Sequence, residues 1–190
     1  PNNKIICNHA KEISDTATGY FIGNSISYTG ENTEKLIEWF SISDIDNVDM
    51  RIAKNMSVYG KGYELINMSD DDKPTPKSYS IDPRNAFIIY DDTVEHKPLV
   101  GIYYYPLFNS MGNIVNYNIN IYTDYDIRMI KTGENFENDI EIGYFLNPFG
   151  KVQVIEYSNN EEQQGDFEQV ISLIDAYNLL MSDRVNDKEQ

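Results

Sequence analysis

Four segments of the chain carry apolar residues at steps of three and four, the spacing that gathers side chains on one face of an α-helix. These predicted helices are Lys4–Asn24, a short segment after Asn32 and Thr33, Asn47–Tyr59 and Asp166–Asp187. In the first, the predicted buried face consists of Ile6, Ala10, Ile13, Ala17 and the pair Tyr20 and Phe21. Gly60 is expected to end the third helix, and Asp166 to cap the last with Gln169 three positions later.

Between these helices the pattern changes to runs of β-branched and aromatic residues bounded by turn residues, which is typical of strands. Seven strands are predicted: Gly62–Met68, Lys77–Ile81, Ala86–Tyr90, Leu99–Tyr105, Ile114–Tyr122, Ile127–Lys131 and Lys151–Tyr157. Met111-Gly112-Asn113 predicts a hairpin connection, and the apolar-free stretch Ser158–Gly165 predicts a flexible link to the last helix.

The order of these elements lacks the regular alternation of strand and helix that builds parallel sheets. We therefore predict an α+β fold, with N-terminal helices, one mostly antiparallel mixed sheet of about six to seven strands and a long C-terminal helix. Residues 1–190 are expected to form a single domain.

The charge balance narrows the function classes. The chain has a formal net charge of −16, whereas affinity for nucleic acid comes mainly from Lys and Arg that displace counterions. This balance argues against a general nucleic-acid binder. The one cysteine, Cys7, excludes an intrachain disulfide framework. No apolar run approaches the roughly 20 residues of a membrane helix and no secretory signal is visible, so no membrane partner is expected.

Two polar turns are the strongest candidates for chemistry. Asp82-Pro83-Arg84-Asn85 precedes the predicted strand Ala86–Tyr90, and Asp91-Asp92-Thr93-Val94-Glu95-His96-Lys97-Pro98 follows it. Neighbouring carboxylates beside a histidine suit metal-assisted hydrolysis, so one interpretation is a hydrolase or nuclease that uses Asp91, Asp92, Glu95 and His96. Asp and Pro also form turns through their own backbone chemistry, and we favour that structural interpretation.

The remaining motifs are weaker. The run Asp70-Asp71-Asp72 lacks the glycine and glutamate of a calcium loop, and Gly60-Lys61-Gly62 lacks the third glycine of a dinucleotide fingerprint. Cys7 near His9 is more typical of a packing residue than of a nucleophile. We therefore predict no catalytic residue, no metal ligand and no cofactor.

The two polar turns also carry a resemblance. Together with Tyr59-Gly60, the runs Asp82-Pro83-Arg84-Asn85, Asp91-Asp92 and Glu95-His96-Lys97-Pro98 resemble the portal proteins of tailed, double-stranded DNA bacteriophages with long non-contractile tails. Further stretches agree in the same order at Thr18–Asn24, Asn147–Gly150, Val154–Tyr157 and Asp166–Asn178. The resemblance spans nearly the whole chain, and it gives these motif residues a structural role.

The resemblance implies a subunit of a ring of about a dozen copies at one capsid vertex. Such rings work with terminase, scaffolding and head–tail adaptor proteins and let double-stranded DNA pass without tight binding. It also implies a location in the virion, and in the host cytoplasm during assembly. We expect residues 1–190 to be the wing region of a longer chain, with residues 166–190 as a helix leading toward the stem. A monomeric head-completion adaptor is an alternative.

Overall fold

The computed structural model describes residues 3–70 and 72–188. Its helices are α1 (His9–Ile22), α2 (Glu34–Ser43), α3 (Ile45–Tyr59) and α4 (Ile171–Lys188), with short 3-10 turns at Pro83–Asn85 and Glu168–Val170. Its strands are β1 (Lys61–Met68), β2 (Pro76–Ile81), β3 (Ala86–Tyr90), β4 (Pro98–Phe108), β5 (Ile114–Tyr122), β6 (Asp126–Gly133), β7 (Ile140–Leu146) and β8 (Val154–Ser158). The α+β fold is confirmed, with helices at both ends of a block of antiparallel strands.

The strands form two sheets rather than the single sheet that the sequence predicted. One sheet has three strands in the order β2-β1-β8, and the other has five in the order β3-β4-β5-β6-β7. All pairs are antiparallel, and β8 returns from far along the chain to pair with β1. Strand β7 was missing from the prediction. Its alternation is interrupted by a bulge opposite Met129 and Ile130, and the adjacent apolar residues Phe145 and Leu146 hide the period.

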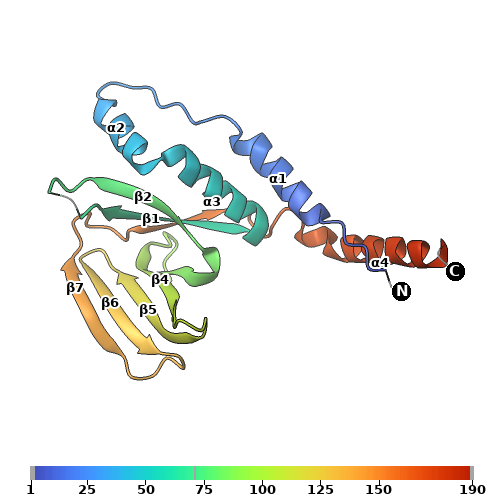
Figure 1. The fold of residues 1–190 in the computed structure, drawn as a ribbon. Helices are drawn as coiled ribbons and strands as arrows, with labels where there is room; N and C mark the ends of the chain where they lie inside the picture. The colour runs from blue at the N-terminus through green and yellow to red at the C-terminus, as the bar shows by residue number, and fades with distance from the viewer. Residues whose placement is uncertain (1–2, 71, 189–190) are drawn as a thin grey trace.

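The core lies between the two sheets. Tyr63, Leu65 and Val154 of the three-stranded sheet cluster with buried residues of the five-stranded sheet, namely Ala86, Tyr122 and Ile127. Gly101 on β4 makes this close contact possible, because a Cβ there would lie 2.7 Å from the Cβ of Val154. The other face of the three-stranded sheet supports α2 and α3. Figure 1 shows the resulting layers, with the helices on the side of β1 and β2 away from β4–β7.

Helix α1 buries a different face from the predicted one. Its buried residues are Ser14, Thr18 and Ile22, spaced four apart, whereas Tyr20 is 95% exposed and Phe21 is 72% exposed. The prediction followed apolar side chains, but the contact with α3 is partly polar and needs small residues. The helix also starts later than expected, at His9, because the Asn8 side chain accepts a hydrogen bond from the Lys11 amide.

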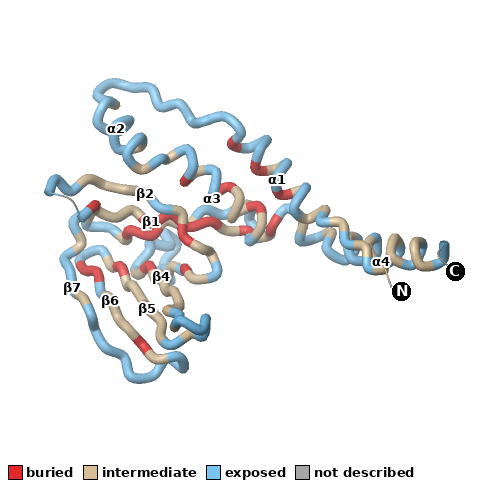
Figure 2. Tube along the Cα trace, in the orientation of Figure 1, coloured by how far each residue is buried: buried red, intermediate tan, exposed pale blue. Residues whose placement is uncertain are grey.

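Helix α4 extends away from the body of the molecule (Figure 1), and none of its described residues is buried (Figure 2). It is held by the N-terminal segment Asn3–Cys7, which we call the strap. The amides of Asn3, Ile5 and Cys7 donate to side chains at four-residue spacing along α4: to Asn186 Oδ1 at 2.8 Å, Ser182 Oγ at 3.0 Å and Asn178 Oδ1 at 2.8 Å.

The carbonyl oxygens of the same three strap residues face the same three side chains of α4. Asn178 Nδ2 and Asn186 Nδ2 donate to the carbonyls of Cys7 and Asn3, and Ser182 Oγ lies 3.3 Å from the carbonyl of Ile5. The ladder fits because four helical residues rise about 6.0 Å, close to the roughly 6.6 Å that two extended residues span. The strap therefore uses α4 as a polar edge, in place of a neighbouring strand.

The junction before α4 differs from the prediction in two ways. The helix begins at Ile171, after the 3-10 turn, so Asp166 does not cap it; Asp166 Oδ1 instead accepts from Asn159 Nδ2 at 2.9 Å. The stretch Ser158–Gly165 is a hydrogen-bonded turn against the end of α3 instead of a loose link. The Asn159 amide donates to the Gly60 carbonyl at 2.9 Å, and the Asp166 amide donates to the Ser57 carbonyl at 2.8 Å.

Removing the ladder is expected to loosen α4 selectively. In the double variant Asn178→Ala, Ser182→Ala, the strap amides of Ile5 and Cys7 lose their acceptors, at a cost of about 1 kcal/mol per bond. Hydrogen exchange of the α4 amides should then quicken while the amides of β4, β5 and β6 stay protected. The matched control Leu180→Ala changes an exposed residue outside the ladder and should leave exchange unchanged. Equal exchange in both variants would contradict a role for the ladder.

Candidate functional site

The first predicted turn joins three parts of the fold. Asp82 caps the 3-10 turn by accepting from the Arg84 amide at 2.9 Å, and its carboxylate also receives the guanidinium of Arg84, with Nη2 2.6 Å from Oδ2. The Arg84 guanidinium lies over the Tyr59 ring, 5.8 Å from its centroid, at the end of α3. Tyr104 of β4 donates to the Arg84 carbonyl at 3.0 Å. Arg84 therefore pairs within its own turn, with Asp82.

Gly60 ends α3, as predicted, and its conformation requires glycine. Its φ is +76°, in the left-handed region, and a Cβ at this position would lie 1.8 Å from the carbonyl oxygen of Gln163. The chain that leads to α4 therefore packs directly on the backbone at the end of α3. Tyr59 and Gly60 thus contact the turn before β3 and the segment that leads to α4.

The second predicted turn is the loop of the β3–β4 hairpin, and Asp91 organises it. Asp91 Oδ1 accepts from Thr93 Oγ1 at 2.9 Å and from the Lys97 amide at 3.0 Å. Desolvation opposes the effect, but these hydrogen bonds from Thr93 and Lys97 hold the pKa of Asp91 below its ordinary value. His96 adopts a left-handed backbone with φ of +45°, which reverses the chain toward Pro98 at the start of β4.

The structure does not bring the twelve motif residues into one site. Tyr59, Gly60 and Asp82-Pro83-Arg84-Asn85 lie at one end of β3, and Asp91-Asp92 with Glu95-His96-Lys97-Pro98 lie at the other. Five strand residues separate the groups by roughly 17 Å. Among residues 3–70 and 72–188, no three His, Cys, Asp or Glu side chains converge as ion ligands would.

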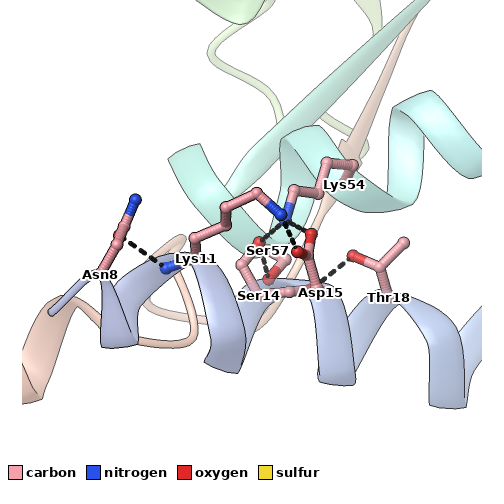
Figure 3. Close-up of polar contacts among 7 residues, drawn as sticks. All are labelled: Asn8, Lys11, Ser14, Asp15, Thr18, Lys54 and Ser57. Atoms are coloured by element: carbon pink, nitrogen blue, oxygen red, sulfur yellow. Dashed lines mark hydrogen bonds and ion pairs between the residues drawn. The ribbon is translucent and has the colours of Figure 1, made fainter.

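A polar cluster between α1 and α3 is the most buried functional candidate, and sequence reasoning missed it (Figure 3). Ser14 is fully buried and Ser57 is 3% exposed. Ser57 Oγ donates to Ser14 Oγ at 3.0 Å, and Lys54 Nζ reaches Ser14 Oγ at 2.7 Å and Asp15 Oδ1 at 2.6 Å. Lys11 also pairs with Asp15. The only sequence signal was hydroxyl residues four apart on a helix face, which the apolar pattern outweighed.

A serine beside a lysine invites comparison with a nucleophile and its base, but the geometry opposes this function. The Lys54 ammonium is paired with the Asp15 carboxylate, and hydrogen bonds from Lys11 and Lys54 hold the pKa of Asp15 below its ordinary value of 3.8. A base must be neutral, and a nucleophile must be reachable, whereas Ser14 has no exposed surface. The cluster is a polar bracket between two helices.

The remaining sequence candidates also have structural partners. Cys7 is a free thiol whose backbone belongs to the strap ladder. Asp71 of the acidic turn lies outside the described residues. Tyr104 and Tyr117 pack edge to face, and Phe136 stacks on Tyr117 with ring centroids 4.8 Å apart, so these aromatic rings are already occupied by one another. In the described parts of the chain, no helix is long and apolar enough to cross a membrane.

Comparison with known proteins covers the whole chain. The family model described as "Phage portal protein, SPP1 Gp6-like" matches residues 1–190. The chain belongs to the phage portal protein family. Portal-family membership covers the helices, both sheets and α4 alike, so the motif turns, the polar bracket and the strap all lie within one portal-family region. This confirms the resemblance noted in the two polar turns.

A curated relative gives the same result. The "Portal protein" of Bacillus phage SPP1 is 24% identical to this chain over 197 residues, an alignment that covers 95% of the chain and 38% of the relative. The chain therefore spans less than half the length of the portal protein it matches. The architecture described above corresponds to one portion of such a protein.

The Asp15 ion pairs should make the stability of the α1–α3 contact depend on acid. Because the pKa of Asp15 is lower in the folded state, its contribution is present above pH 3.8 and is lost as pH falls through the lower folded value. Asp15→Asn should therefore lower the thermal midpoint at neutral pH and have little effect in strong acid. Asp92→Asn, in an exposed hairpin, serves as the control. A midpoint difference that is independent of pH would contradict the assignment.

Proposed function

We propose that this chain forms the wing region of a subunit in a phage portal ring at the capsid vertex. The single observation that carries the proposal is the match of the portal family to all 190 residues. The ring serves as the passage for DNA during packaging and ejection, and as the docking site for terminase, scaffolding and head–tail adaptor proteins. Its place is the virion, after assembly in the host cytoplasm.

The large accessible surface of the chain supports its proposed place in a protein assembly. Its accessible surface is 13181 Å² for a mass of 21.9 kDa, against about 9,300 Å² for a compact monomer of that size. Apolar residues of α4 and β7 contribute to this surface: Leu173, Leu180 and Leu146 are 68%, 66% and 75% exposed. Large apolar side chains in such positions are typical of protein–protein interfaces.

The net charge of the chain supports a ring through which DNA passes without tight binding. A net charge of −16 repels phosphates, and the few cations at the described sites are already paired: Arg84 with Asp82, Arg128 with Asp126 and Lys54 with Asp15. DNA that moves through a ring must not bind it tightly. An acidic wing fits that requirement.

The mass of the full-length protein in solution tests the ring. We expect a closed assembly of about a dozen subunits, measured by native mass spectrometry or light scattering. Rings should persist in the Asp92→Ala variant, because Asp92 has no catalytic role in this proposal. A full-length protein that stays monomeric at every concentration and salt would overturn the ring and favour an adaptor. A metal-dependent nuclease activity lost in Asp92→Ala would favour the hydrolase.

DNA binding gives a second test. Residues 1–190 should not shift duplex DNA in a mobility assay even at about 50 mM salt, where electrostatic binding is strong. The charge-reduced variant Glu161→Gln, Glu162→Gln, which alters an exposed turn, should behave in the same way. A tight complex whose affinity falls steeply with salt would show that the chain holds DNA and would contradict the proposed passage without binding.

A further inference from the structure

One face of the five-stranded sheet is apolar and lies on the side away from the core. In a strand, successive side chains point to opposite faces. Tyr122 of β5 and Ile127 of β6 face the core and are opposite each other in the sheet. Ala86 of β3 and Tyr103 of β4 also face the core and are opposite each other. The alternate positions form the opposite face, which we call the outer sheet face; it includes Phe87, Ile89, Ile102, Ile119, Ile121 and Ile130.

Strand β5 shows the contrast within nine residues. Its core-side positions before Tyr122 are Asn116, Asn118 and Asn120, and its outer positions are apolar, as in Ile119 and Ile121. A strand with one solvated face normally places its polar residues on that face. Here the apolar residues take the face turned away from the core. The sequence of β5 is therefore suited to a partner on the outer sheet face.

Burial of the outer sheet face would leave few charged groups without a partner. Arg128 lies in the same row as Ile102 and Ile121, but its Nε already donates to Asp126 Oδ2 at 3.0 Å, and its guanidinium lies 6.0 Å from the Tyr144 ring centroid. Phe87 and Ile89 at the edge of the face are 43% and 46% exposed. Desolvating an ion pair that is already formed costs less than desolvating an unpaired ion. The face is therefore ready to be covered by an apolar element.

The chain carries a second apolar surface, on α4. On α4 the strap occupies the face of Asn178, Ser182 and Asn186. Leu173, Ala176 and Leu180 are exposed and recur at steps of three and four on the opposite face, which we call the α4 stripe. Figure 1 shows α4 projecting from one end of the molecule, away from β5, β6 and β7. One subunit thus presents two different apolar surfaces at separate ends.

The dimensions of the two surfaces agree. Leu173 and Leu180 are seven residues apart, or about 10 Å along a helix. Ile89 or Phe87 on β3, Ile102 on β4 and Ile121 on β5 lie on three adjacent strands, which span about 10 Å across the sheet. A head-to-tail ring needs two unlike surfaces on each subunit that fit each other. A second copy of the chain satisfies this requirement with these two surfaces.

We infer that the outer sheet face of one subunit binds the α4 stripe of the neighbouring copy. This inference rests on the proposed ring and adds the contact that closes it. The strap is part of the arrangement, because it covers the polar face of α4 and orients the apolar stripe outward. The occupant is a helix of a second copy, and the contact is apolar at its centre. Arg128, paired with Asp126, lies in the same row as Ile102 and Ile121.

Crosslinking between two full-length variants tests the contact. Both carry Cys7→Ser and have their other cysteines replaced; one has Ile121→Cys and the other Leu180→Cys, with tags of different size. The variants are assembled together and treated with a short bifunctional maleimide. We expect a covalent product that contains both tags, at several times the yield obtained when Asn120→Cys replaces Ile121→Cys. Asn120 is the adjacent residue of β5 and faces the other side of the sheet.

The outcomes separate the contact from the ring. Rings of normal mass in which Ile121→Cys and Leu180→Cys give no more product than the Asn120→Cys control would overturn the contact and leave the ring intact. The same holds if Ile121→Cys in assembled rings is protected from a monofunctional maleimide without crosslinking to Leu180→Cys, because another part of the same chain then covers the face. Failure of all variants and the parent protein to assemble would instead overturn the proposed function.

Discussion

The contact between the two sheets is the constraint on which the other parts depend. It passes through Gly101, where the absence of a side chain lets Val154 of β8 approach β4. Because β8 also pairs with β1, this contact fixes the five-stranded sheet to the layer that supports the helices. A side chain at this point would collide with Val154 and Val152 and force β8 away from β4. Polar side-chain contacts between elements then fix the orientations of elements that the apolar core already holds together.

In these polar contacts, charged groups are paired with neighbouring side chains. Arg84 is shared between Asp82 and Tyr59, Lys54 between Ser14 and Asp15, and Tyr157 donates to the buried Glu64 at 2.6 Å. The orientation of each of these groups is therefore set by the fold. Carboxylates and tyrosines that the sequence offered as isolated polar residues are in this way joined into the contacts between elements.

The sequence predicted what depends on local pattern and missed what depends on distant partners. Strands β3 and β5 were predicted to the residue because their alternation and turns are local signals. The division into two sheets was missed, because it depends on β8 (Val154–Ser158) pairing with β1 (Lys61–Met68), which lie far apart in the sequence. Ser14 was missed because a polar residue in a helix interface is recognisable only when its partners on α3 are known. The motif turns were found, but their separation by β3 was not.

The strap has a consequence for how such chains vary. Ile5 and Cys7 bond to α4 through their backbone amides, so these bonds constrain Ser182 and Asn178 more than the side chains at positions 5 and 7. Proline is the exception, because it has no amide hydrogen to donate. It would be excluded at Ile5 and Cys7, whose amides enter the ladder, and its missing amide would matter less at Lys4 and Ile6. In this segment the constraint repeats at every second residue, because the amides of Ile5 and Cys7 donate to α4.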